Sequence, residues 1–223
     1  MYSKEGKIKR TMSNFIDVTD ELIEEIGINN VTIRKVAEKA GYNSASIYNY
    51  FENLDHLIYF ASLRNLKDYG MNLNTYLKKS RNAMDTFLLV WDCFCDHAYY
   101  KPEVYKALFF VELKNDPEHY IKEYYEMFPI EFGEHDPTIS RMLLAGNIHD
   151  RGMKTINDCI KEGFITKEDG PLLNDMTMLI FESMLHKILR GDISYDDARN
   201  LTMTYYKAIV KSFLLRDYDF MNI

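Results

Sequence analysis

The 223-residue sequence predicts an all-α protein, and three observations lead to that prediction. Apolar residues recur at three- and four-residue intervals over long stretches, which is the spacing of one face of an α-helix. All 5 prolines lie beyond residue 100, so few helix breakers interrupt those stretches. Nowhere does an alternating apolar pattern flank a tight-turn dipeptide, as a β-hairpin requires.

The first predicted helix begins near Ile8. Its apolar stripe consists of Met12, Phe15, Ile16, Leu22, Ile23 and Ile26. Gly27 can take the left-handed conformation that ends a helix, and Ile28 can fold back over that end. The acidic residues of this segment lie largely off the stripe, where water solvates them.

The next stretch, VTIRKVAEKAGYNSASIYNYF from Val31 to Phe51, predicts two short helices around one glycine. Thr32 can cap the first helix and Asn43 the second, because their side-chain oxygens can accept a hydrogen bond from a free backbone N–H. Gly41 can adopt the positive φ that a sharp turn between them needs.

The outer side of the second short helix is small and polar. Ile47 falls on the inner side, where it can bury against the first helix. The opposite side presents Ala45, Ser46 and Asn49, and Tyr48 and Tyr50 flank it. Asparagine can read a base edge and tyrosine hydroxyls can reach phosphates, so the pair predicts a helix-turn-helix. The alternative, on spacing alone, is an ordinary helix pair with a solvated outer face.

Seven further helices are predicted. They span residues 53–78, 81–100, 103–114, 117–127, 138–162, 174–190 and 194–215. Asn53 and Ser194 can cap two of them, and Asp136 with Pro137 can open a third.

The composition of the sequence limits the cellular compartment and the binding partners that we expect. The formal net charge of −7 means that bulk electrostatics do not favour a polyanionic partner. Cys93, Cys95 and Cys159 are an odd number without framework spacing, which indicates a reducing compartment. No apolar run follows the basic start, and none reaches the roughly 18 to 20 residues of a membrane helix. We therefore expect a cytoplasmic protein that does not bind membranes.

The region from Ile8 to Phe60 resembles the N-terminal DNA-binding domain of the TetR family of bacterial transcriptional regulators. The resemblance rests on VTIRKVAEKAG, on IYNYF and on the DHL that follows. It implies a three-helix DNA-binding domain over residues 1–55, with the recognition helix at Ser44–Tyr50, and a helical effector-binding and dimerisation domain over residues 56–223. The DNA contacts that it implies are Thr32, Arg34, Ser44, Ala45, Ser46, Tyr48, Asn49 and Tyr50.

The sequence departs from the family pattern in its charge. The lysine that family members usually carry at the start of the fourth helix is Leu54 here. Residues 1–60 hold seven Lys and Arg against nine Asp and Glu, a net charge of −2. Basic residues gather only locally, at Lys4, Lys7, Lys9 and Arg10, and at Arg34, Lys35 and Lys39 near the expected DNA groove. We therefore expect modest non-specific affinity for DNA.

The last two predicted helices are apolar on more than one side and must be buried on more than one side. One side can face the core and the other a second copy of the chain, which gives a four-helix dimer interface. The predicted interface residues are Phe181, Met184, Leu185, Ile209 and Phe213. A dimer suits a palindromic operator, because two recognition helices can address half-sites one turn apart. The alternative is a pair of core helices in a monomer.

The resemblance also implies a small-molecule effector in the C-terminal domain. The candidate ligand-binding residues, on helices that line the pocket in the family, are Trp91, Phe94, Tyr99, Phe109, Phe110 and His149. Aromatic residues are barely enriched in this part of the sequence, and each of these side chains is more often a core residue.

No motif indicates catalysis, a metal or a cofactor. Cys93 and His97 share a helix face, but zinc needs three or four converging ligands and no partner pair has ligand spacing. Nucleophile motifs, phosphate loops and metal-hydrolase helices do not occur. The sequence therefore predicts an effector-responsive DNA-binding repressor and not an enzyme. Two alternatives remain: a C-terminal domain that binds a protein partner, and an all-α enzyme or binding module whose apparent head merely packs.

Overall fold

The computed structural model describes residues 4–110, 117–128 and 137–220. Every regular element within these ranges is a helix, which confirms the predicted all-α fold. None of the helices in the described part of the chain is both long and apolar enough to cross a membrane.

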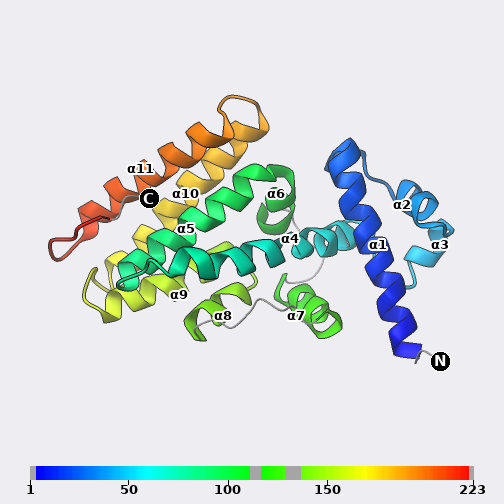
Figure 1. The fold of residues 1–223 in the computed structure, drawn as a ribbon, viewed down its shortest axis with the longest axis horizontal. Coiled ribbons are helices and arrows are strands. Elements are labelled where there is room, and N and C mark those ends of the chain that lie inside the picture. Colours follow the sequence, from blue (N-terminus) through cyan, green and yellow to red (C-terminus); the bar gives the residue numbers. More distant parts are fainter. Residues whose placement is uncertain (1–3, 111–116, 129–136, 221–223) are drawn as a thin grey trace. The chain divides into compact units, whose positions relative to one another are not determined.

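The chain forms two compact units, one from residues 1–67 and 103–131 and the other from residues 68–102 and 132–223. Helix α4 (Leu54–Leu77) begins in the first unit and ends in the second (Figure 1).

The first unit is built on α1 (Lys4–Ile26), whose Phe15 and Ile16 have no exposed surface. A short 3₁₀ turn, η1 (Ile28–Asn30), follows Gly27, whose φ of 78° confirms the predicted left-handed stop. The Glu103 carboxylate accepts the Ile28 N–H at 2.9 Å and so holds this turn. The other helices of the unit are α2 (Ile33–Ala40), α3 (Ser44–Ile47), the first part of α4, α6 (Pro102–Phe110) and α7 (Pro117–Met127).

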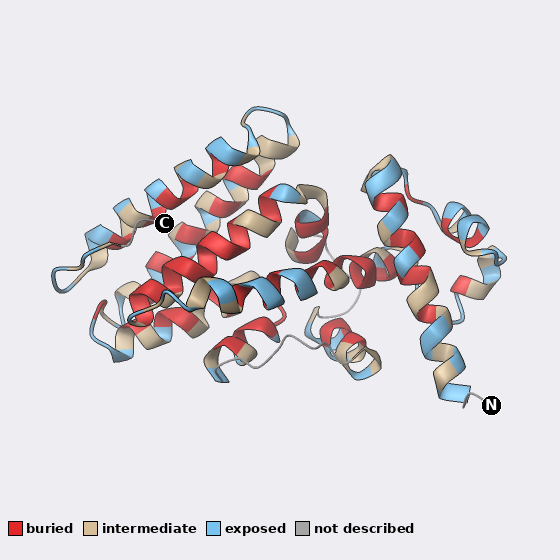
Figure 2. Cartoon of the chain, in the orientation of Figure 1, coloured by how far each residue is buried: buried red, intermediate tan, exposed pale blue. Residues whose placement is uncertain are grey.

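The second unit surrounds α5 (Ala83–Tyr100), which is buried over most of its surface (Figure 2). Helices α9, α10 and α11 all contact α5, and α10 and α11 lie side by side (Figure 1). The helices of this unit that follow α5 are α8 (Pro137–Leu143), which packs against α9, and then α9 (Ile148–Lys161), α10 (Asp169–Leu189) and α11 (Tyr195–Phe213).

Two predicted helices differ from the observed ones. The prediction of one helix over 138–162 is wrong, because the chain forms α8 and α9. Asn147 starts the second of these: its Oδ1 accepts the Asp150 N–H at 2.8 Å. Helix α10 begins at Asp169 and not at 174, because Thr166 Oγ1 accepts the Asp169 N–H at 3.0 Å. Residues 111–114 of the predicted helix 103–114, and the predicted opening residue Asp136, lie outside the described residues.

Helices α9 and α10 approach each other closely at Gly152. A Cβ atom at this position would lie 2.0 Å from Asn174 Oδ1. Asn174 is fully buried, and its Nδ2 donates to the His149 carbonyl at 3.1 Å. Glycine is therefore required here by the close approach of two helices.

An ionic network joins α4, α5 and α11 within the second unit. Arg199 on α11 donates through Nε to Asp92 Oδ1 at 3.0 Å, and its Nη1 lies 3.2 Å from Asp96 Oδ1. Tyr76 on α4 donates to Asp96 Oδ2 at 2.9 Å, and Tyr195 donates to the same carboxylate. Burial raises the pKa of the Asp92 carboxyl even though Arg199 lies beside it. One guanidinium thus compensates two carboxylates.

His56, near the start of α4, is buried in a neutral form. Its Nδ1 accepts the Glu52 N–H at 3.2 Å, and its ring packs edge-on against Phe60 with the centroids 4.4 Å apart. Burial lowers the pKa of the imidazole from 6.5 to about 4. The unfolded chain therefore binds a proton at a pH where the folded chain does not, and stability falls as pH falls through that window.

We expect His56 to cost the first unit up to about 3 kcal/mol of stability as pH falls from about 6.5 to about 4. Replacing His56 by glutamine keeps an acceptor for the Glu52 N–H but removes the titration. Urea unfolding of both proteins across this range measures the effect. The stability of the wild type relative to the variant should decrease toward low pH, and a difference independent of pH would contradict the assignment.

Candidate DNA-binding surface and effector cavity

Two caps and one glycine fix the turn between α2 and α3. Thr32 Oγ1 accepts the Lys35 N–H at 3.3 Å, and Asn43 Oδ1 accepts the Ser46 N–H at 2.9 Å. Gly41 between the helices has a φ of 77°, in the left-handed region. The predicted caps and the predicted glycine turn are thereby confirmed.

Helix α3 is shorter than the predicted recognition helix Ser44–Tyr50. It ends at Ile47, whose carbonyl accepts the N–H of Tyr50 at 2.9 Å and that of Phe51 at 3.0 Å. Aromatic packing favours this tight turn, because the Tyr50 ring lies 6.0 Å from the Phe15 ring of α1. Residues 48–50 therefore form a hydrogen-bonded turn beyond the end of α3.

The surface presented by α3 is uncharged and polar. Ile47 is fully buried beneath it, whereas the Tyr48 residue is 58% exposed. Ser46 Oγ donates to Asn43 Oδ1 at 3.1 Å, so its hydroxyl is already engaged. The exposed members of the predicted DNA-contact set are Thr32, Arg34, Ala45, Tyr48 and Asn49, and the half-buried members are Ser44, Ser46 and Tyr50. Much of the outer side of α2 and α3 is exposed (Figure 2).

The basic patch near α2 is smaller than the sequence indicates. The Lys39 Nζ lies 2.6 Å from Glu25 Oε1 and 3.2 Å from Glu21 Oε2 on α1. These two carboxylates neutralise the ammonium, and the ion pairs raise the pKa of Lys39. Lys35 Nζ donates to the Asn30 carbonyl at 2.9 Å. We therefore expect few cations to be available to phosphates on this surface.

The second unit contains a small cavity of about 20 Å³, enough for about one water-sized group. Its lining consists of Tyr69, Val90, Trp91, Phe94, Met142, Ile148, Arg151, Gly152 and Thr155. Among the lining residues that the structure describes, Arg151 alone is charged. Its buried guanidinium donates to the Ala145 carbonyl at 3.0 Å and to the Leu143 carbonyl at 2.9 Å, which ties the end of α8 to α9.

Trp91 and Phe94 are the two predicted ligand-binding residues that line this cavity. Tyr99 is buried in the core instead, where its hydroxyl lies 2.9 Å from Thr202 Oγ1. The side chain of His149 is 47% exposed and contacts Asp150. Phe109 and Phe110 belong to the first unit. Arg151 was not among the predicted ligand-binding residues. A cation on the apolar face of a helix is unusual, and that pattern in the sequence could have indicated a functional residue.

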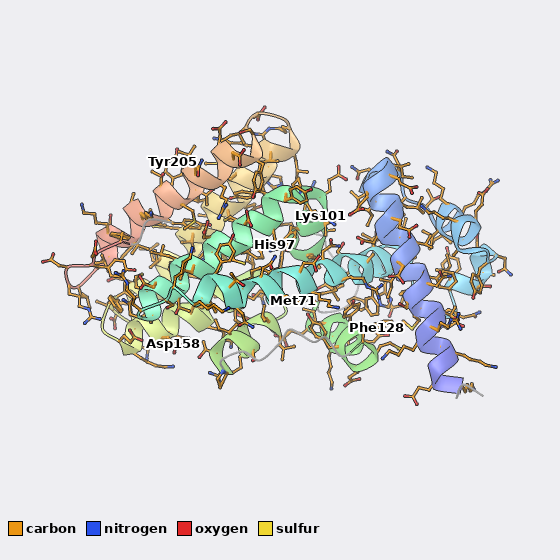
Figure 3. The ribbon with its side chains drawn as sticks, in the orientation of Figure 1. Met71, His97, Lys101, Phe128, Asp158 and Tyr205 are labelled. Carbon is orange, nitrogen blue, oxygen red and sulfur yellow. The ribbon has the colours of Figure 1, made fainter. Side chains whose placement is uncertain are left out.

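No group of three or more His, Cys, Asp or Glu among the described residues is placed to hold a metal ion. The Nε2 atom of His97, which is labelled in Figure 3, lies 3.2 Å from Asn72 Nδ2, so the imidazole has an amide partner. Cys93, Cys95 and Cys159 are buried free thiols, and burial raises the pKa of each.

Three of the predicted dimer residues point into the protomer, which corrects their assignment. Phe181, Met184 and Leu185 are buried because they lie on the side of α10 that packs into the core. The Phe181 ring, for example, stacks on Tyr99 with the centroids 5.6 Å apart. Ile209 and Phe213 are half-buried. The large exposed apolar residues of α10 and α11 are Leu172, Leu179 and Tyr205 (Figure 3 labels Tyr205).

Comparison with known proteins identifies the N-terminal region. Residues 15–58 match the family model for bacterial regulatory proteins of the tetR family. A search of the curated proteins gave no match.

Solved structures match along most of the chain. A TetR-family protein of Syntrophomonas wolfei has a TM-score of 0.62 and 13% identity over 94% of this chain and 99% of its own. RolR in complex with resorcinol has a TM-score of 0.60 and 17% identity, covering 94% and 90%. Thermus thermophilus FadR in complex with lauroyl-CoA has a TM-score of 0.58 and 12% identity, covering 95% and 99%.

The chain places a helix-turn-helix near its N-terminus, in α2 and α3, and further helices follow it. The chain carries the N-terminal domain of the TetR family of bacterial transcriptional regulators, and as a whole it has the fold of that family.

Proposed function

We propose that the protein is a homodimeric cytoplasmic repressor that binds a palindromic operator and releases it when a small-molecule effector binds. Residues 1–55 form the DNA-binding domain in this proposal, and residues 56–223 form the effector-binding and dimerisation domain. The observation that carries it is the exposed, uncharged surface of α3 over a buried Ile47, within a region that matches the family model. An effector acts by favouring a state in which the two heads no longer fit the operator.

The proposal assigns different roles to two exposed polar side chains of this surface, Tyr48 and Asn49. Tyr48 reaches a phosphate, because its hydroxyl stands at the edge of the face. Asn49 meets a base edge, because a carboxamide can donate and accept in one plane. Thr32 can cap α2 and still donate its hydroxyl hydrogen to a phosphate, because the cap uses only an oxygen lone pair.

Replacing Asn49 by alanine is expected to weaken operator binding by about 1 to 3 kcal/mol and binding to scrambled duplex by much less. Replacing Tyr48 by phenylalanine should weaken binding to both duplexes alike, because phosphates carry no sequence information. Gel shifts with DNA from upstream of the chain's own gene measure both. The matched control is Asn157→Ala on α9, an exposed asparagine far along the chain, which should change neither affinity. Equal losses on both duplexes for Asn49→Ala would exclude α3 as the sequence reader.

Dimerisation rests on the apolar surface that α10 and α11 leave exposed. Leu179 on α10 is 66% exposed and Tyr205 on α11 is 41% exposed, and these two helices lie side by side. A second copy that covers this surface would form a four-helix interface.

Replacing Leu179 by glutamate should convert the dimer to a monomer, because burial of an unpaired carboxylate costs several kcal/mol. Sedimentation at micromolar concentration measures the change. Leu144→Glu is the matched control, because Leu144 is an exposed leucine outside these two helices, and it should leave the dimer intact. A wild-type monomer under the same conditions would remove both the dimer and the palindromic operator from the proposal.

The effector part of the proposal is supported by the cavity lined by Trp91 and Phe94 and by the two ligand complexes among the similar structures. A ligand that binds only the folded protein must raise its melting temperature. A thermal-shift screen with a metabolite panel therefore tests it, and an operator gel shift shows whether a stabilising compound also releases DNA. Partner proteins in place of small molecules would be indicated if no compound stabilised the protein.

A further inference from the structure

A second, larger depression lies beside the small cavity within the second unit. This groove has a volume of about 480 Å³, within the range of small-molecule sites of roughly 300 to 1,000 Å³. It is lined by Leu77, Ser80, Asn82, Ala83, Thr86, Thr138, Ile139, Thr155, Asp158, Lys161 and Glu162. Thr155 lines both the groove and the cavity, so a single side chain stands at their junction.

One face of α9 runs along both spaces. Ile148, Arg151 and Thr155 line the cavity, and Asp158 and Glu162 continue at the same helical spacing into the groove (Figure 3 labels Asp158). From Ile148 to Glu162 this face rises by about 21 Å, at about 1.5 Å per residue. The two spaces therefore lie end to end along one helix face, and their lining is almost wholly apolar at the Trp91 end and more polar at the Glu162 end.

The groove end is rich in hydroxyl groups and carries an excess of negative charge. Ser80 Oγ and Thr86 Oγ1 lie 2.7 Å apart. The Lys161 ammonium lies 2.6 Å from Asp158 Oδ1, so its charge is compensated within the groove. The Glu162 carboxylate accepts the Ala83 N–H at 3.0 Å and has no cation of its own among the groove-lining residues that the structure describes. A negatively charged group in the groove would meet this carboxylate.

We propose that the effector is an elongated amphipathic molecule whose apolar end occupies the cavity and whose polar end, uncharged or positively charged, occupies the groove. This inference rests on the proposed function, because it names the chemical class of the effector. The cavity is too small for an alkyl group, so a lining side chain must move when the effector binds. Met142 is the flexible side chain of the lining that can change its conformation. Hydroxyl or amine groups on the polar end would bond to Ser80, Thr86 and Glu162.

The opposite orientation has a different chemical signature. A carboxylate at the cavity end would lie against the Arg151 guanidinium, with the apolar chain in the hydroxyl-lined groove. That arrangement would place hydrocarbon against the hydroxyl groups of Ser80, Thr86 and Thr138, which costs free energy for every hydroxyl left without a partner. It predicts an anionic effector and so can be separated by experiment.

Three chain-matched probes distinguish the orientations: octan-1-ol below its solubility limit, and octylammonium and octanoate below their micellar concentrations. Calorimetry and thermal shift on the full chain should show that octylammonium and octan-1-ol bind at least about tenfold more tightly than octanoate, because the anion meets Glu162. Octanoate as the tightest probe, or no binding by any probe, would overturn the inference.

Two variants and one control test whether the probes bind in the groove and whether Glu162 causes the preference for octylammonium over octanoate. Glu162→Gln keeps an acceptor for the Ala83 N–H and should reduce the preference for octylammonium over octanoate by about tenfold. Thr155→Leu should weaken the binding of all three probes, because the larger side chain fills the junction. Glu168→Gln removes an exposed carboxylate outside the groove lining and should leave the preference unchanged. An unchanged preference in Glu162→Gln would overturn the assignment of the polar end.

Operator binding in the absence of any probe separates this inference from the proposed function. If the probes bind in the expected order but their addition leaves the affinity for the operator unchanged, the binding site is supported and control of DNA binding by an effector is contradicted. If the protein binds the operator and the probes bind in the opposite order of affinity, the proposed DNA-binding function is supported and the proposed effector class is wrong.

Discussion

Replacing Arg199 by methionine should lower the free energy of unfolding by about 3 to 5 kcal/mol, the usual cost of removing one partner of a buried ion pair. Asp92 is buried, with 5% of its surface exposed, and would lose the guanidinium that compensates it. Asp96 would keep its bonds from Tyr76 and Tyr195 but lose its cation. Urea unfolding followed by far-UV circular dichroism measures the change.

A second substitution tests whether the lost charge is the cause. The double variant Arg199→Met with Asp92→Asn replaces the uncompensated carboxylate by a neutral amide, and it should recover a substantial part of the loss. The surface control is Arg190→Met, whose partner Asp192 is exposed, and it should cost no more than about 1 kcal/mol. Equal losses in the single and double variants would show that Arg199 acts by packing.

Replacing Gly152 by alanine should destabilise the protein by about 1 to 2 kcal/mol, because an overpacking cost of up to about 3 kcal/mol exceeds the roughly 1 kcal/mol by which alanine favours an α-helix over glycine. The new Cβ would stand 2.0 Å from Asn174 Oδ1. The Asn174 side chain is fully buried, so it cannot swing into solvent, and moving it breaks its bond to the His149 carbonyl. Thermal and urea unfolding measure the loss.

Shortening Asn174 to alanine in the Gly152→Ala background provides the test of mechanism. That change removes the atom with which the Cβ collides, so the double variant should be more stable than the sum of the two single losses predicts. Gly163→Ala is a useful contrast, because nothing lies within 4 Å of a Cβ there and its cost comes from a φ of +72° instead. Simple additivity at 152 and 174 would mean that the helices separate to relieve the contact.

The features that the sequence predicted well are local. Thr32, Asn43, Asn53 and Ser194 all cap helices as expected, because a cap depends on a side chain and a backbone N–H only three residues apart. Asn147 is a cap of the same kind inside the predicted helix 138–162, and it divides that segment into α8 and α9. The apolar spacing of residues 138–162 alone predicts one continuous helix, whereas the Asn147 cap predicts the break between α8 and α9.

The features that the sequence did not predict depend on which side of a helix meets which neighbour. Apolar residues occur on most sides of α10, so the sequence alone does not decide which of them face the core of the protomer and which face a second copy. Phe181 packs on Tyr99 of α5, and that contact could not be read from α10 alone. The neutralised Lys39 is a similar case, because its partners Glu21 and Glu25 are remote in sequence and come beside it only through the packing of α2 on α1.

The three buried thiols have a practical consequence for measurement. Alkylating reagents react with the thiolate, and Cys93, Cys95 and Cys159 are enclosed with their pKa values raised. A cysteine introduced at an exposed position of α2, such as Glu38, would therefore be the reactive thiol under native conditions. A fluorophore or spin label attached there in each copy of a dimer would report the separation of the two heads directly. The native background needs no cysteine removal for that distance to be followed as an effector is added.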